Sequence, residues 1–144
     1  MFTIYRLQSD RRQIREVQQA TQTTDQWGIE PTHGLFGSPE WWQHIRNGTL
    51  PIHHVRGKIS RVYMGSMNDW PEFAMVSDTG EESEWSRYAN EPEFDFFYTV
   101  GRPIEIDYVI QRTRGNPADF QEVPIEIRVD DKTPNQALER TADT

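Results

Sequence analysis

The sequence predicts an α+β fold: a strongly bent antiparallel sheet, or a small β-barrel, with one or two short helices. Stretches with apolar residues at every second position follow one another from residue 53 to residue 129, which is the pattern of half-buried strands. Turn residues such as Asp78-Thr79-Gly80 separate these stretches and favour antiparallel hairpins. Helix patterns occur only before residue 48, so the two kinds of element are segregated along the chain, as in α+β proteins.

The two predicted helices have recognisable ends. The first covers residues 11–20 and is capped by Ser9. The second begins after Ser38, a favourable N-cap, has Pro39 at its first position, and ends before Gly48.

The second helix carries two adjacent tryptophans, Trp41 and Trp42. A helix this short is not stable in isolation. We therefore expect it to pack on the rest of the fold and to bury at least one of the two rings.

The strands are expected at β-prone segments that turn residues separate. These segments cover residues 2–7, 52–55, 58–64, 70–77, 81–88, 94–100, 103–113 and 123–129. Pro71 lies near the start of its segment, which predicts that this strand begins at a sheet edge. The last segment is a second possible edge strand, unless the N-terminal strand or the helices cover it.

Length and periodicity together predict the domain organisation. The chain has 144 residues, a length typical of one domain with its own core. We predict a single α+β domain over residues 1–131. Residues 132–144 contain few apolar residues and no periodic pattern, so we predict a C-terminal tail there.

Composition excludes several classes of function. The formal net charge is −8, and an acidic surface repels both nucleic acids and anionic membranes. The chain contains no cysteine, which rules out disulfides and thiolate chemistry. It also shows no apolar run of signal-peptide or membrane-span length. We therefore expect a cytoplasmic protein that binds neither nucleic acid nor membrane.

Two segments resemble known proteins. The tail Pro134-Asn135-Gln136-Ala137-Leu138-Glu139-Arg140-Thr141-Ala142 resembles the C-terminus of proteins encoded on bacterial integron gene cassettes. That resemblance implies a mobile, single-domain bacterial protein of unknown function and assigns no catalytic residue. The strand rhythm of residues 55–111 is similar to that of small five-stranded barrels of the oligonucleotide-binding type. The negative charge argues against carrying over their nucleic-acid binding.

Large aromatic residues are the main candidates for a functional surface, because they exceed what a small sheet core requires. Aromatic residues form ligand pockets and oligomer interfaces, although they also form ordinary cores. The candidate ligand-binding or interface residues are Trp27, Trp41, Trp42, His44, Trp70 and Trp85. We predict a non-enzymatic binding module that takes a small ligand or a protein partner and self-associates. We predict no cofactor and no metal.

Two other functions stay open at this stage. A small hydrolase or lyase would use His44 with Glu40 or Asp69, since Glu40 and His44 lie one helical turn apart. An acidic decoy or immunity-type protein would instead neutralise a basic partner. Its candidate residues are Glu81, Glu82, Glu84 and Asp107.

Overall fold

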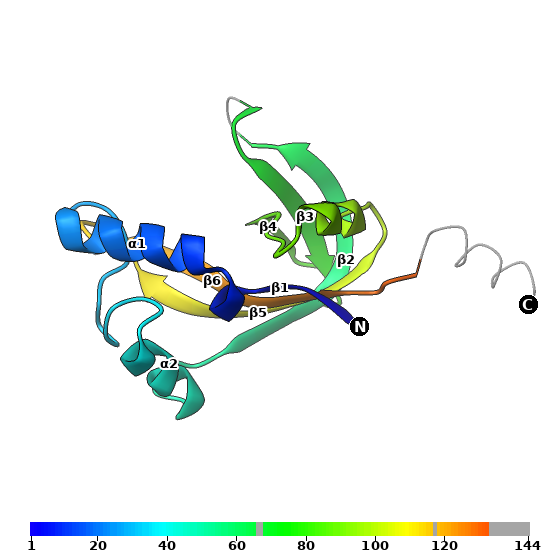
Figure 1. Ribbon diagram of the computed structural model, residues 1–144. Helices are drawn as coiled ribbons and strands as arrows, with labels where there is room; N and C mark the ends of the chain where they lie inside the picture. The colour runs from blue at the N-terminus through cyan, green and yellow to red at the C-terminus, as the bar shows by residue number, and fades with distance from the viewer. Residues whose placement is uncertain (66–67, 117, 133–144) are drawn as a thin grey trace, which may run out of the picture.

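A computed structural model describes residues 1–65, 68–116 and 118–132. In this part of the chain, a six-stranded antiparallel sheet is combined with two α-helices and short 3₁₀ segments (Figure 1). The strands are β1 (Phe2–Arg6), β2 (His53–Met64), β3 (Pro71–Ser77), β4 (Glu82–Ser86), β5 (Pro103–Arg112) and β6 (Phe120–Val129). The helices are η1 (Leu7–Ser9), α1 (Arg11–Thr23), α2 (Pro39–Arg46) and η3 (Pro92–Phe97). The strand order is β1-β6-β5-β2-β3-β4.

The sheet is strongly bent, as predicted, and β2 is the strand about which it bends. The first half of β2 pairs with β5 and its second half with β3. The hairpin of β3 and β4 therefore rises away from the β1-β6-β5 half (Figure 1). Gly57 lies where the two halves meet, and a Cβ there would be 2.0 Å from the carbonyl oxygen of Val76. Only glycine permits this close approach of the two backbones.

The sheet does not close into a barrel, so the barrel alternative and the likeness to oligonucleotide-binding barrels are wrong as descriptions of this architecture. Closure would require the two edge strands, β4 and β1, to pair along their length, and the described residues form no such ladder. The free part of β6 cannot close the sheet in an antiparallel ladder with β4 either. All the ladders between them are antiparallel, so β4 and β6 run in the same direction. In addition, β1 already occupies the outer edge of β6 from Glu126 to Val129.

A single asparagine joins the two ends of the sheet instead. Asn90 follows β4, and its backbone N–H donates to the carbonyl oxygen of Ile4 at 3.0 Å. Its side-chain amide accepts from the N–H of Arg6 at 2.7 Å and donates to the carbonyl oxygen of Arg6 at 3.1 Å. The side chain thus mimics a paired strand residue at one point, and the rest of the boundary between β4 and β6 is left open.

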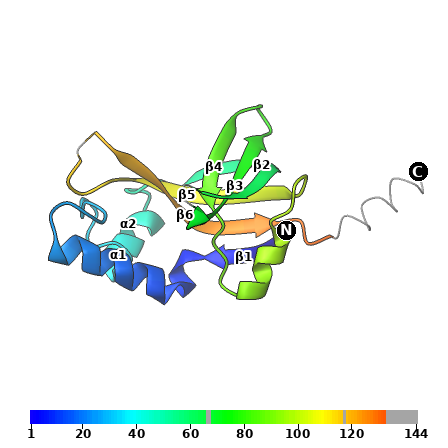
Figure 2. The same ribbon diagram turned by 90° about the horizontal axis from the view of Figure 1, so that it is seen from above.

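The helices lie at one end of the molecule, away from η3 (Figure 2). α2 has the predicted bounds, and the Ser38 hydroxyl accepts from the N–H of Trp41 at 3.2 Å. Trp41 is completely buried, and its indole N–H donates to the Gln111 side chain at 3.0 Å. The expectation that at least one of the two adjacent rings is buried is therefore confirmed.

The ends of α1 differ from the prediction. Asp10, rather than Ser9, caps this helix by accepting from the N–H of Gln13 at 3.1 Å. Ser9 instead ends η1, which the sequence analysis did not predict. The helix also continues to Thr23, three residues beyond the predicted end at residue 20.

Two strand predictions are wrong. The segment that begins with Pro71 was expected at a sheet edge, but β3 lies between β2 and β4 and pairs with both. Residues 94–100 were expected to be a strand, but η3 covers Pro92–Phe97. Proline favours the first position of a helical turn, and the N–H of Tyr98 closes the segment on the carbonyl oxygen of Asp95 at 3.1 Å. The aromatic residues there suggested β structure, but local backbone hydrogen bonding decides the conformation.

The last strand is longer than predicted and is an edge over only part of its length. It begins at Phe120 instead of residue 123. β1 covers it from Glu126 onward, so the N-terminal strand protects the segment that was suspected to be an edge. The predicted tail covers residues 132–144, and all of it after residue 132 lies outside the described residues. None of the described helices is both long and apolar enough to cross a membrane.

Candidate functional site

The predicted aromatic residues do not form one site. Trp41 and Trp85 belong to the core, and Trp42 is partly buried against it. Trp27 and Trp70 are 67 % and 49 % exposed; Trp27 follows α1, and Trp70 precedes β3. Trp70 is held in place because its indole N–H donates to the hydroxyl of Ser86 at 2.8 Å.

His44 lies near one of its two suggested partners, Glu40, and far from the other, Asp69. It is partly buried on α2, and its Nε2 lies 3.9 Å from the Glu40 carboxylate. Asp69 follows β2, which runs from near α2 to the far end of the molecule (Figure 1), so it cannot reach His44. In the described part of the chain, no three His, Asp or Glu side chains are grouped as a metal site.

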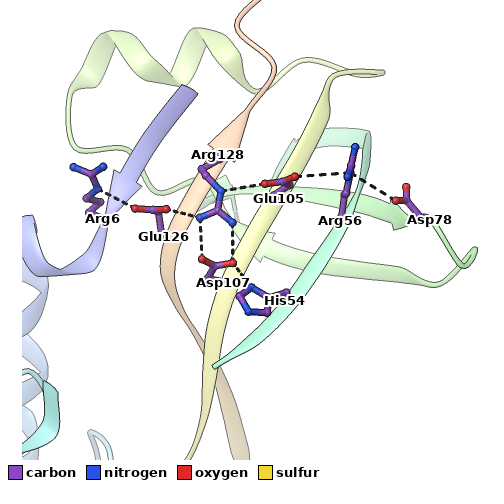
Figure 3. Close-up of polar contacts among 8 residues, drawn as sticks. All are labelled: Arg6, His54, Arg56, Asp78, Glu105, Asp107, Glu126 and Arg128. Atoms are coloured by element: carbon purple, nitrogen blue, oxygen red, sulfur yellow. Dashed lines mark hydrogen bonds and ion pairs between the residues drawn. The ribbon is translucent and has the colours of Figure 1, made fainter. Parts of the chain in front are cut away.

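A network of ion pairs covers the outer face of the first half of the sheet (Figure 3). Arg128 on β6 is its centre and makes two bonds of 2.8 Å to the Asp107 carboxylate. It also contacts Glu105 at 3.1 Å and Glu126. These hydrogen bonds from Arg128 hold the pKa of the Asp107 carboxyl below its ordinary value, although burial acts in the opposite direction.

The network continues across four strands. Arg6 on β1 lies 2.9 Å from Glu126, and His54 on β2 lies 2.6 Å from Asp107 (Figure 3). The Asp107 side chain is only 17 % exposed. Asp107 was a candidate for neutralising a basic partner, but its carboxylate is engaged inside the fold.

The acidic residues of the β3–β4 hairpin are placed differently. Glu81 and Glu82 are exposed. Glu84 pairs with Arg61 at 3.0 Å, but both side chains are more than half exposed, and such pairs contribute little to stability. These three carboxylates are accessible to a partner in a way that Asp107 is not.

A surface hollow of about 290 Å³ lies at the open boundary between β4 and β6. We call this region the seam, and it is lined by Glu84, Trp85, Ser86, Tyr88, Phe120, Glu122 and Pro124. The Trp85 ring packs 5.2 Å from the Tyr108 ring beneath it. Burial raises the pKa of Tyr108, and Glu122 and Glu81 raise it further. The two carboxylates, one from each side of the boundary, therefore act on the same phenol.

Sequence reasoning missed Phe120 and Glu122. Phe120 is 56 % exposed, and Glu122 lies two positions further along the same strand. The apolar alternation that begins at Val123 does not extend back to these residues, because Gln121 occupies the next apolar position, so it gives no signal for them. The neighbouring Asn116-Pro117 pair favoured a loop instead.

The sequence of the chain matches the model of a known protein family. A family model described as "Immunity protein RhsI2" matches residues 1–130 of the chain. No curated protein matches the chain. The match spans all six strands and both α-helices. It does not include residues 134–142, whose resemblance to cassette-encoded proteins also lies outside the described residues.

Proposed function

Because the chain belongs to the RhsI2 immunity protein family, we propose that it binds an Rhs toxin and holds that toxin inactive. The family match over residues 1–130 is the observation that carries this proposal. Membership of an immunity family implies a protein partner. It therefore favours the immunity-type hypothesis over the small-ligand module and over the hydrolase or lyase.

The surface of the protein is compatible with this role. The net charge of −8 suits a basic partner, because opposite charges accelerate association and exclude wrong partners. Exposed rings such as Trp70 and Phe120 are of the type that forms the centre of protein interfaces. Both lie beside β4, close to the exposed carboxylates of the hairpin.

Co-expression tests the proposal directly. Rhs toxin domains from the source genome would be expressed in bacteria with the chain, and with an unrelated acidic protein of similar size as the control. We expect the chain, and not the control, to restore growth against one toxin domain. The purified pair should elute as one complex in size-exclusion chromatography. Failure to rescue growth against any of these toxins, together with no complex, would contradict the proposal.

The cytoplasmic location expected from the sequence is part of the same proposal. Fractionation of cells that produce the chain at its native level checks it. We expect the chain in the cytoplasmic fraction, and its recovery in the periplasm would contradict this.

A further inference from the structure

We propose that the toxin is bound by strand addition: an extended basic segment of the toxin pairs with the free edge of β4 and reaches across the seam to Phe120 and Glu122. This inference rests on the proposed function and identifies the surface that carries it. The other carboxylate-rich region, the network around Arg128, is excluded because its charges are paired within the fold.

The backbone of β4 offers unused hydrogen-bonding groups. In the described part of the chain, β4 is the outermost strand and pairs with β3 alone. At the two ends of this ladder, Ser77 N–H donates to Glu81 O at 2.8 Å and Arg87 N–H donates to Pro71 O at 3.1 Å. Antiparallel ladders alternate, so the N–H and C=O groups of residues 82 and 84 point away from β3. An edge of this kind is a template for another strand.

The opposite side of the seam is also unpaired. β1 pairs with β6 only from Glu126 onward, so within the described residues Phe120 to Pro124 has no strand partner other than β5. Asn90 bonds to β1 beyond the end of β4, which fixes the spacing of the two sides. β4 and β6 run in the same direction. A toxin segment that lies antiparallel to β4 is therefore also antiparallel to β6, which is a geometry that allows strand addition.

The side chains around the seam select the chemistry of the segment. Glu82 and Glu84 project from the same face of β4, and Glu122 projects from β6. Lysine or arginine at alternate positions of the segment would meet these carboxylates. Arg61 already pairs with Glu84, but this exposed pair can be exchanged at little cost.

An alternative explains the same carboxylates. Charged residues on an edge strand commonly prevent pairing between copies of a protein. If this explanation alone holds, removing the charges promotes self-association but leaves the affinity for the toxin unchanged. The two explanations therefore predict different results for the same variants.

The test compares Glu84→Pro with Glu84→Gln in calorimetric titration against the toxin domain that passes the co-expression test. Both variants remove the charge, but only proline removes the outward N–H. Proline is tolerated at edge positions whose N–H faces solvent, so the melting temperatures of the two variants should agree. We expect Glu84→Gln to weaken binding by about threefold and Glu84→Pro by at least about thirtyfold.

Two charge-reversal variants and amide hydrogen exchange supply the controls for this titration. Glu122→Lys should weaken binding by at least about tenfold, whereas Glu93→Lys, on the distant η3, should leave affinity unchanged. In the wild-type complex, hydrogen exchange at the amides of residues 82 and 84 should slow. This readout decides the matter if Glu84→Pro does not fold.

The possible failures are distinguishable. Equal affinity of the two Glu84 variants, or unchanged amide exchange at residues 82 and 84 in a wild-type complex, overturns strand addition and leaves the proposed function intact. No binding of any toxin domain by the wild-type chain overturns the proposed function itself.

Discussion

The two halves of the sheet share β2 but are completed in different ways. In the first half, both faces of β5 are covered: Ile106 and Val109 are completely buried, and Gln111 is buried where it accepts a hydrogen bond from Trp41 of α2. In the hairpin half, β4 buries only Trp85, and no strand of the described part of the chain pairs with its outer edge. The first half thus contains most of the packing that stabilises the fold, and the second half contains the surface that is free to bind.

The same contrast holds for charge. Asp107 in the first half is enclosed by Arg128 and His54, so it contributes to cohesion between strands. Glu81 and Glu82 in the hairpin are exposed, so their charge is available to a partner. The residue type is acidic in both places, and its role depends on whether a neighbouring strand supplies a counter-ion.

The largest stability effect should come from the centre of the first half. Trp41→Ala removes a completely buried ring and the hydrogen-bond partner of Gln111. We expect the free energy of unfolding to fall by about 3–5 kcal/mol. Urea denaturation measures it, with Trp27→Ala, at a largely exposed position, as the matched control. Equal stabilities of the two variants would contradict the assignment of Trp41 to the core.

The next largest effect should come from the ion-pair network. Arg128→Gln leaves the carboxylates of Glu105, Asp107 and Glu126 facing one another without their shared cation. We expect a loss of about 2–3 kcal/mol, less than for a fully buried pair because these groups are partly exposed. Arg61→Gln, which breaks one exposed pair, should cost less than about 1 kcal/mol. Similar costs for the two variants would show that the network adds nothing beyond single surface pairs.

Acid should weaken the same network. Hydrogen bonds from Arg128 lower the pKa of Asp107 in the folded protein, so Asp107 binds a proton more readily when unfolded. Its contribution to stability is therefore present above the unfolded pKa of about 3.9 and is lost as the pH falls through the lower folded value. Urea titrations between pH 6 and pH 3 should show a steeper loss for the wild type than for Asp107→Asn. Parallel pH profiles would rule out this contribution.

The contrast between the halves also explains what could be predicted from the sequence. Local signals were sufficient for α2, because Ser38 and Pro39 mark its start. They were also sufficient to locate β5, but not its faces throughout, because Val109 and Gln111 are buried while Ile110 is exposed. Local signals also identified Glu81 and Glu82 as exposed acidic residues.

The remaining features depend on contacts between distant parts of the chain. Arg128 and Asp107 lie 21 positions apart, and Asn90 and Arg6 lie 84 positions apart. No local sequence pattern predicts either of these contacts. The seam was missed for the same reason, because it exists only where β4 and β6 come near each other without pairing.

The sheet edges also determine self-association, which remains a prediction. A bare β4 edge favours a two-fold dimer, whereas the carboxylates of Glu82 and Glu84 oppose one. We expect the sedimentation-average mass to rise above the 17.0 kDa of one chain as the concentration increases through the micromolar range. Glu82→Gln should enhance this rise. A single species of one-chain mass at all concentrations, for both proteins, would show that this edge does not self-associate.

The smallest stability effect should come from the hairpin carboxylates, and it gives the sharpest test of the contrast between the two halves. Glu81→Lys and Glu82→Lys change exposed side chains for which the structure gives no ion pair among the described residues. We expect each to change the free energy of unfolding by less than about 0.5 kcal/mol. The slight reduction in net negative charge should, if anything, favour the folded state.

Both substitutions place positive charge beside the seam, so the affinity for a basic toxin segment should fall while the urea midpoint stays constant. A loss of stability comparable to that of Arg128→Gln would mean that the hairpin contributes to the fold as the first half does, and the division between a stabilising half and a binding half would then be wrong.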